Sequence, residues 1–187
     1  MPTDLDIRIR ELEKTIMTQK SALAALRREL PPQVVTDYAL TAMTGAPTTL
    51  GALFQGFPTM LLVHNMGARC SYCTLWADGF NGLTRQLSRR CGFAVSSHDT
   101  PEQMRAIATE RGWTFPLVSV AGTTLAKDLG FGNTPQEAQP GISSLTRAAD
   151  GVITRRAYTH LGPGDNYCIQ WDLMDLLSDH ATEWKPR

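Results

Sequence analysis

The stretch that decides the fold reads TMLLVHNMGARCSYCTLWADGF and occupies residues 59–80. Its first six residues, 59–64, form a nearly continuous apolar run, which is typical of a strand buried on both faces of a sheet. A short loop at residues 65–69 follows, and the sequence from Cys70 then predicts a helix that extends to about residue 88. Two cysteines, Cys70 and Cys73, therefore stand at the junction between a buried strand and a helix.

This junction favours redox chemistry at the cysteine pair. Cys70 falls where unpaired backbone N–H groups and the positive end of the helix dipole meet, and both stabilise a thiolate. Arg69 adds positive charge directly before it. Cys73 lies one turn into the helix, within reach of Cys70, so it can attack a mixed disulfide formed there. The sequence predicts Cys70 as the nucleophile and Cys73 as the resolving thiol.

Two other interpretations of the cysteine pair stay open. A structural zinc site needs four ligands, usually two such pairs, whereas Cys91 and Cys168 are single cysteines on separate predicted elements. The pair could also be two inert core residues, because free cysteine is often buried. We expect no metal and no cofactor, and we expect Cys91 and Cys168 to lie in the core.

The remaining pattern alternates strands and helices. Asp150-Gly151 is a strong hairpin signal between the two strands that follow Pro140-Gly141. Alternation predicts an α/β fold whose mixed central sheet has a parallel core and an antiparallel edge hairpin. Besides those described above, the predicted strands are 34–40, 91–96, 115–120, 142–147 and 152–158, and the predicted helices are 48–55, 100–112, 125–129 and 165–177, the last with its apolar residues facing inward.

A long helix is predicted at the N-terminus, over residues 3–30. Its apolar side chains recur at alternating spacings of four and three, and Pro31 and Pro32 end it. We call this row the heptad seam; it comprises Leu5, Ile9, Leu12, Ile16, Gln19, Leu23, Leu26 and Leu30. The helix either packs on its own domain or forms a homodimer with Gln19 at a core position. We expect residues 1–32 to form this helix and residues 33–187 to form the domain.

Composition narrows the classes of partner. The 187 residues are 42% hydrophobic and 19% charged, with a formal net charge of zero, so no overall field attracts nucleic acid or an anionic membrane. No apolar run is long enough for a membrane helix, and the acidic N-terminus is unlike a signal peptide. Four cysteines are too few for a disulfide-stapled secreted protein, so we expect a cytoplasmic location.

Several motifs carry a resemblance to a known family. They are the cysteine pair followed by Trp76-Ala77-Asp78, the segment 112–116 (GWTFP), and Pro140-Gly141 before the hairpin. Together they resemble the thioredoxin superfamily, and in particular a bacterial family catalogued as domain of unknown function 899 and described as predicted dithiol–disulfide oxidoreductases. The resemblance implies a thioredoxin-like three-layer sandwich preceded by the long helix. The loop before Cys70 is shorter than is usual in that family, so the chain resembles a divergent member.

The resemblance also implies roles for further residues around the cysteine pair. Pro140 stands where thioredoxin-like proteins place a cis-proline that faces the cysteines. His64 stands six residues before Cys70, where thioredoxins carry a buried acid that handles the proton of the resolving thiol; a structural histidine is the alternative. Trp76 is a candidate lid over the site, and Asp78 is expected to form hydrogen bonds rather than to act as an acid.

Three functions are consistent with these observations. The first is a thiol–disulfide oxidoreductase acting on a disulfide-bearing protein or a small thiol; Ser71-Tyr72 resembles the pair seen in glutaredoxins, which makes glutathione a candidate electron donor. The second is a peroxiredoxin-like peroxidase, against which stands Gly67, where those enzymes have threonine or serine. The third is a non-catalytic binding or assembly module that dimerises through the first helix.

Overall fold

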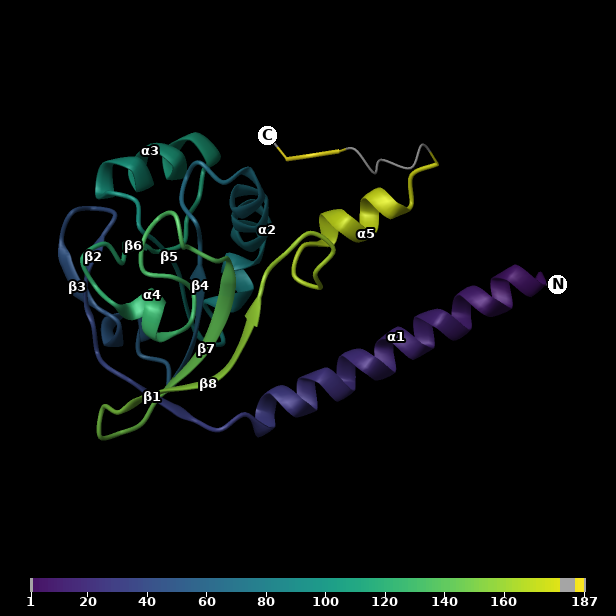
Figure 1. The fold of residues 1–187 in the computed structure, drawn as a ribbon, viewed down its shortest axis with the longest axis horizontal. Helices are drawn as coiled ribbons and strands as arrows, with labels where there is room; N and C mark the ends of the chain where they lie inside the picture. The colour runs from purple at the N-terminus through teal and green to yellow at the C-terminus, as the bar shows by residue number, and fades with distance from the viewer. Residues whose placement is uncertain (1, 179–183, 187) are drawn as a thin grey trace.

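The computed structural model describes residues 2–178 and 184–186. An eight-stranded mixed sheet forms the body, and a long helix extends away from it (Figure 1). The strands are β1 (Gln33–Val35), β2 (Ala39–Ala42), β3 (Pro47–Thr49), β4 (Thr59–His64), β5 (Gly92–Ser97), β6 (Leu117–Ser119), β7 (Gly141–Arg147) and β8 (Ile153–His160). The helices are α1 (Asp4–Glu29), α2 (Ser71–Leu87), α3 (Pro101–Arg111), α4 (Leu125–Asp128) and α5 (Ile169–Asp175), with a short 3₁₀ helix, η1 (Gly51–Phe54).

The predicted stretch 59–64 is the central strand β4. It pairs in parallel with β5 and antiparallel with β7, so that His64 lies beside Ser96 on one strand and Gly141 on the other. β5 pairs in parallel with β6, and β7 forms the hairpin with β8. The strand order β1-β8-β7-β4-β5-β6-β2-β3 confirms a parallel core with antiparallel strands toward both edges.

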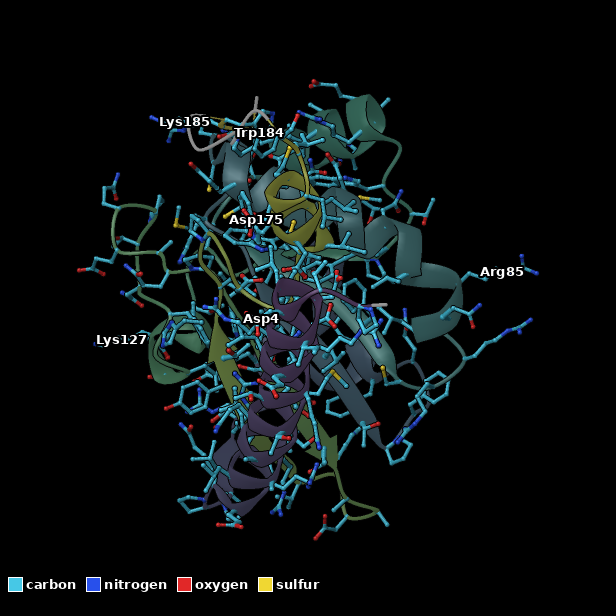
Figure 2. The ribbon with its side chains drawn as sticks, turned by 90° about the vertical axis from the view of Figure 1, so that its right-hand side faces the viewer. Asp4, Arg85, Lys127, Asp175, Trp184 and Lys185 are labelled. Atoms are coloured by element: carbon cyan, nitrogen blue, oxygen red, sulfur yellow. The ribbon has the colours of Figure 1, made fainter. Side chains whose placement is uncertain are left out.

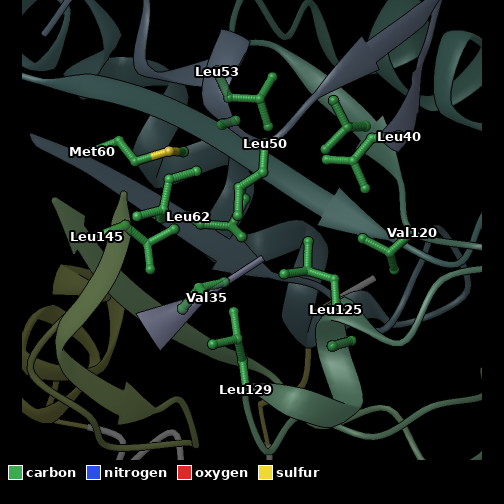
Figure 3. Packing of buried hydrophobic residues seen from close by; sticks show 14 of the residues in the cluster. Val35, Leu40, Leu50, Leu53, Met60, Leu62, Val120, Leu125, Leu129 and Leu145 are labelled. Atoms are coloured by element: carbon green, nitrogen blue, oxygen red, sulfur yellow. The ribbon is translucent and has the colours of Figure 1, made fainter. Parts of the chain in front are cut away.

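Side chains alternate between the two faces of β4 and fill two separate cores. Met60 and Leu62 pack with Leu50, Leu125 and other residues of η1 and α4 (Figure 3). Leu61 and Val63 point the other way, toward the side chains of α2 and α3. The sheet therefore lies between two layers, which confirms the three-layer thioredoxin-like sandwich.

The strand predicted at residues 34–40 is in fact two strands, which lie toward opposite edges of the sheet. β1 pairs with β8 at one edge, whereas β2 pairs with β3 and β6 near the other edge. Between them the Asp37 carboxylate accepts a hydrogen bond from the Gly51 N–H, which turns the chain toward η1. The helix predicted at 48–55 is likewise shorter, because Pro47–Thr49 pairs with β2 as β3.

The last helix departs from the prediction. α5 covers only Ile169–Asp175. Four of the five apolar side chains expected to face inward are exposed, in or just after this helix: Ile169, Leu173, Leu176 and Leu177. α5 approaches the body through Trp171, which packs on the side chains of α2, so the residues around the rest of its circumference have no sheet beneath them. The inward orientation predicted for these residues is wrong.

The N-terminal helix forms as predicted and stands away from the body. Thr3 and Asp6 form a capping box at its start, and it ends at Glu29, two residues before Pro31. None of its residues is buried (Figure 2, where Asp4 marks its first turn). Its last turn touches the body, where the Arg27 guanidinium donates to the Tyr167 and Thr159 hydroxyls. Of the two predicted arrangements, the one in which this helix packs along its own domain is therefore wrong. Among the described residues, every helix is too short or too polar to form a transmembrane span.

Candidate active site

The two cysteines form the start of α2. Cys70 is the N-cap residue, and its sulfur accepts a hydrogen bond from the Cys73 backbone N–H at 3.2 Å. The Cys70 carbonyl accepts from the Thr74 N–H at 3.0 Å, the first bond of the helix. A sulfur thus occupies the position in which serine or aspartate usually caps a helix, and the N–H groups of the first turn converge on it.

The loop before Cys70 is held by a carboxylate from the turn that follows β5. The Asp99 side chain accepts a hydrogen bond from the Ala68 N–H at 2.8 Å, and the Asn65 side chain accepts from the Gly67 N–H at 2.7 Å. Gly67 has a φ of +105°, and a Cβ atom there would lie 2.7 Å from an Asp99 oxygen. Only glycine fits at this position without displacing Asp99.

The two thiols have opposite acidities. The pKa of Cys70 is lowered from 9.0 to about 6, first by the hydrogen bond from the Cys73 thiol and then by backbone N–H groups of residues 73 and 72, against a burial effect that raises it. The pKa of Cys73 is raised by that same hydrogen bond and by burial, with a smaller contribution from the charge of Asp99. Cys70 is half-buried, whereas Cys73 is 2% exposed. One accessible thiolate and one buried proton-bearing thiol result.

A cavity of about 590 Å³ opens in front of Cys70. Polar and apolar groups from three segments line it: the loop and first turn of α2, the turn between β5 and α3, and the segment at 130–139. Its residues are Met66, Arg69, Cys70, Ser71, Tyr72, His98, Asp99, Gln103, Pro135 and Gln136.

Sequence reasoning missed most of this lining. His98 and Asp99 could have been found, because they follow β5, whose carboxyl end lies at the same edge of the sheet as that of its parallel neighbour β4. Pro135 and Gln136 gave no signal, since the segment at 130–139 has no regular structure to place it.

Of the two predicted supporting residues on either side of the cysteine pair, Arg69 lies at the surface and Trp76 lies in the core. Arg69 is exposed and lines the cavity. Its predicted effect on the thiolate is not seen, because its charge is not among the causes of the lowered pKa of Cys70. Trp76 is 3% exposed and packs with Cys73 in the core, against Tyr72 and Trp171. The prediction of Trp76 as a lid is wrong, because the helix turns its side chain inward; Tyr72 lines the cavity instead.

His64 lies on the wrong face of the sheet for the predicted role. The strand alternation that sends Val63 toward α2 sends His64 to the opposite layer, where its ring stacks on Phe131 at 3.9 Å. Its Nε2 shares a hydrogen bond with the Ser143 hydroxyl at 2.9 Å. Burial lowers the pKa of His64 to about 3, so the ring is neutral. This geometry contradicts a proton transfer with Cys73 and fits a structural histidine.

Pro140 also differs from the prediction. Every peptide bond in the described residues is trans, including the one before Pro140. Hydrogen bonds fix the chain on both sides, from the Gln139 N–H to the Phe131 carbonyl and from the Leu161 N–H to the Pro140 carbonyl, and hold it extended into β7. The predicted cis-proline is therefore wrong. The proline that lines the cavity is Pro135.

The Trp-Ala-Asp segment and the segment 112–116 bind each other. The Trp113 indole N–H donates to the Asp78 carboxylate at 2.7 Å, and Arg111 forms an ion pair with the same carboxylate. The Asn81 amide oxygen accepts from the Thr114 N–H at 2.9 Å, while its NH₂ donates to the Gly112 carbonyl. These bonds tie α2 to the end of α3, so Asp78 forms hydrogen bonds as predicted.

All four cysteines are free thiols, and Cys91 and Cys168 are buried as predicted. Within residues 2–178 and 184–186, no three histidine, cysteine, aspartate or glutamate side chains are grouped closely enough to hold a metal ion.

Comparison with known proteins agrees with this fold and places the chain in a family. The sequence matches the family described as bacterial protein of unknown function (DUF899) over residues 8–179. The chain belongs to this family. The DUF899 chain matches none of the curated proteins.

Several solved structures share the fold of this DUF899 protein. Peroxidoxin BcpB from Mycobacterium tuberculosis is 21% identical, with a TM-score of 0.57 over 78% of this chain and 97% of that one. Peroxiredoxin Q from Xanthomonas campestris is 17% identical, with a TM-score of 0.55 over 77% and 91%. A secreted disulfide oxidoreductase from Mycobacterium tuberculosis, described as homologous to Escherichia coli DsbE, is 13% identical, with a TM-score of 0.51 over 75% and 96%. At these identities the likeness shows a shared fold.

Proposed function

We propose that this protein is a dithiol–disulfide oxidoreductase that uses Cys70 as the nucleophile and Cys73 as the resolving thiol. One observation carries the proposal: the Cys70 sulfur caps α2 and accepts a hydrogen bond from the Cys73 backbone N–H, while the Cys73 thiol is buried beside it, and the pKa of Cys70 is lowered whereas that of Cys73 is raised. The cavity in front of Cys70 supplies room for a substrate.

The reaction follows from this asymmetry. The Cys70 thiolate attacks one sulfur of a substrate disulfide, forms a mixed disulfide and releases the other substrate sulfur as a thiolate. The hydrogen bond that raised the pKa of Cys73 is then lost, because Cys70 no longer carries a charge. Cys73 loses its proton, attacks the Cys70 sulfur and releases the second substrate thiol. Two electrons pass to the substrate, and the enzyme is left with a Cys70–Cys73 disulfide.

Asp99 is the acidic group beside the two thiols. It lines the cavity with Cys70, and its charge contributes to the raised pKa of Cys73. We assign it two tasks: its hydrogen bond to the Ala68 N–H positions the loop, and its carboxylate accepts the Cys73 proton when the mixed disulfide resolves. In this assignment Asp99 replaces His64, which lies on the other face of the sheet.

A peroxidase is the second candidate, since peroxidoxin BcpB and peroxiredoxin Q share the fold. The position three residues before Cys70 argues against it: Gly67 has no hydroxyl, and its left-handed backbone and the contact with Asp99 exclude a threonine. Cys70 and Cys73 lie within one helical turn, so Cys73 can resolve a mixed disulfide at Cys70, as disulfide exchange requires.

The decisive experiment follows the dithiol itself. The reduced protein, equilibrated with oxidised dithiothreitol, is expected to lose two daltons in the peptide that contains Cys70 and Cys73. In a separate assay with reduced dithiothreitol as the electron donor, the wild type is expected to catalyse the reduction of insulin. Cys70→Ser is expected to abolish turnover, and Cys73→Ser to accumulate mixed disulfides. A pair that stays reduced would contradict the proposal, and rapid consumption of hydrogen peroxide without insulin reduction would favour the peroxidase.

Three finer points are predictions of the same proposal. The substrate is a disulfide-bearing protein or a small thiol such as glutathione, the protein acts in the cytoplasm, and residues 33–187 form the thioredoxin-like domain behind the helix at 1–32. A homodimer through this helix is a further prediction.

A further inference from the structure

The α2 face of the sheet carries an apolar groove of about 250 Å³. Leu61 of β4 and Ile142 of β7 lie on its floor, and Phe80 and Leu83 of α2 form a wall. Among the described residues outside the sheet and α2, the groove is reached by Arg27 and Tyr167 alone. Leu83 is 51% exposed, so the groove is open to solvent.

The long helix α1 ends at the rim of this groove. Arg27, in the last turn of α1, lines the groove and is hydrogen-bonded to Thr159 and Tyr167 there. The heptad seam is exposed from Leu5 to Leu26: Leu5, Leu12 and Leu26 are each more than 60% exposed. The apolar seam of α1 and the apolar groove are thus both exposed, and they meet at the last turn of α1.

The helix does not reach back over the groove of its own chain. With 26 residues it is about 39 Å long, and it extends away from the body to the N-terminus (Figures 1 and 2). Within the described residues neither the groove nor the seam is covered, so we assign their cover to a second molecule.

The seam is arranged to pair with itself in the opposite direction. In an antiparallel pair of α1 helices, each apolar layer joins one residue from the first half of the helix to one from the second half. The layers are Leu5 with Leu30, Ile9 with Leu26, Leu12 with Leu23 and Ile16 with Gln19 of the second copy. Each of the eight residues of the heptad seam therefore has a partner in the second copy.

The charges beside the seam also favour the antiparallel direction. Residues that flank the seam would meet in pairs of opposite sign: Asp6 with Arg27, Glu13 with Lys20 and Arg8 with Glu29 of the second copy. A parallel pair in the same heptad frame would join Arg8 to Glu13, but would leave Lys20 and Arg27 opposite the uncharged Thr15 and Ala22. Opposite charges at these positions select partner and direction in coiled coils.

We propose that this chain forms a homodimer in which two α1 helices pair antiparallel and the first turns of each helix lie over the groove of the other copy. The antiparallel direction carries Leu5 of one copy to the last turn of α1 in the other, where the groove opens. It also brings the Asp6 carboxylate of one copy to Arg27 of the other. Within one copy, the two salt bridges of the described residues do not include Arg27; they join Arg105 to Glu102 and Arg111 to Asp78.

Charge reversal on α1 tests the direction of pairing in the full-length protein. Light scattering is expected to show a dimer for the wild type and at least a tenfold weaker dimer for Glu13→Lys and for Lys20→Glu, because each places two like-charged pairs in the interface. The double variant, and an equimolar mixture of the two single variants, are expected to recover the dimer. A monomeric wild type, or single variants that gain nothing on mixing, would overturn the proposal.

A matched pair of substitutions tests the groove. Leu83→Arg places a charge in the groove wall and is expected to weaken the dimer. Val152→Arg changes a side chain of similar exposure, 44%, in the turn of the β7–β8 hairpin, and is expected to leave the dimer intact. Equal dimer stability in both variants would show that the groove is not part of the interface.

Discussion

At the scale of single residues, the hydrogen bond between the two thiols shifts their pKa values in opposite directions. Cys70 has a pKa of about 6, so most of it is thiolate at pH 7. We expect the rate of Cys70 alkylation by iodoacetamide to rise with pH through a midpoint near 6 and then to level off. Cys73 should stay unmodified over the same range, because its pKa is raised and it is buried. A midpoint near 9 for Cys70 would contradict this assignment.

Two substitutions of Cys73 separate its hydrogen bond from its chemistry. Cys73→Ser keeps a hydroxyl that can donate to the Cys70 sulfur, whereas Cys73→Ala removes the donor. Since this bond is the largest cause of the lowered pKa of Cys70, we expect the alkylation midpoint to stay low in the serine variant and to move toward 9 in the alanine variant. Identical midpoints would show that the backbone N–H groups alone stabilise the thiolate.

His64 should make the fold sensitive to acid. Its pKa is about 3 in the folded protein, below the ordinary 6.5, so the unfolded chain binds a proton that the folded chain does not. Stability is therefore full above pH 6.5 and falls as the pH drops toward 3, by up to about 1.4 kcal/mol per pH unit. Urea unfolding at pH 7 and pH 4.5 should show a smaller loss for His64→Gln than for the wild type. An equal loss would contradict the role of His64.

The sequence predicted the residues whose chemistry is local and missed those that depend on distant contacts. Cys70 and Cys73 could be placed in the first turn of a helix, because their spacing and the predicted helix start sufficed. His64 was given the wrong role because it was carried over from the position of a buried acid in thioredoxins, whereas alternation along β4 sends its side chain to the face opposite Val63. Asp99 was missed because its role depends on a contact with Ala68, 31 residues away in sequence.

At the scale of elements, two glycines in and before α2 should respond in opposite ways to alanine. Gly67→Ala introduces a Cβ atom 2.7 Å from Asp99 on a backbone with φ of +105°, so we expect the loop to shift and turnover to fall with the fold retained. Gly79 lies inside α2 with no atom within 4 Å of an added Cβ, so Gly79→Ala should stabilise the protein by about 0.5–1 kcal/mol. Activity assays and urea unfolding measure the two effects, and normal turnover in Gly67→Ala would contradict the first.

The connection between α2 and α3 should contribute measurably to stability. Asp78→Ala would leave the buried Trp113 indole N–H without its acceptor, at a cost of about 1–3 kcal/mol. Chemical denaturation compares this variant with Asp165→Ala, which also loses backbone hydrogen bonds but lies outside the α2–α3 connection. We expect the Asp78 variant alone to loosen the end of α3, as measured by faster amide exchange at Thr114.

Elements were predictable where apolar periodicity and end signals agreed. β4 and α3 each have a clear apolar pattern, and α3 also has the Thr100 capping box. Both elements form as expected. The strand predicted at 34–40 shows what pattern alone omits: an apolar pattern does not say which neighbour each half pairs with. Likewise, the apolar face of α5 predicted burial, but the sequence contains no information on whether a surface is available to it.

At the scale of the whole molecule, the proposed dimer links stability to protein concentration. A dimer that dissociates on unfolding loses about 1.4 kcal/mol for each tenfold dilution. We expect the melting temperature of the wild type to rise with concentration, and that of Glu13→Lys to change little. A concentration-independent wild type would indicate that the folded monomer is stable without a partner.

The aromatic cluster around the dithiol gives the protein a built-in optical signal. Tyr72, Trp76 and Trp171 lie with ring centroids 6.1–6.5 Å apart, Trp184 adjoins Trp171, and Trp76 packs in the same core cluster as Cys73. A disulfide accepts an electron from an excited indole more readily than a thiol does, so oxidation of the pair should quench the emission of the nearest tryptophan. Trp76→Phe should remove most of that change. Fluorescence would then report in real time, and without a label, how electrons enter and leave the site.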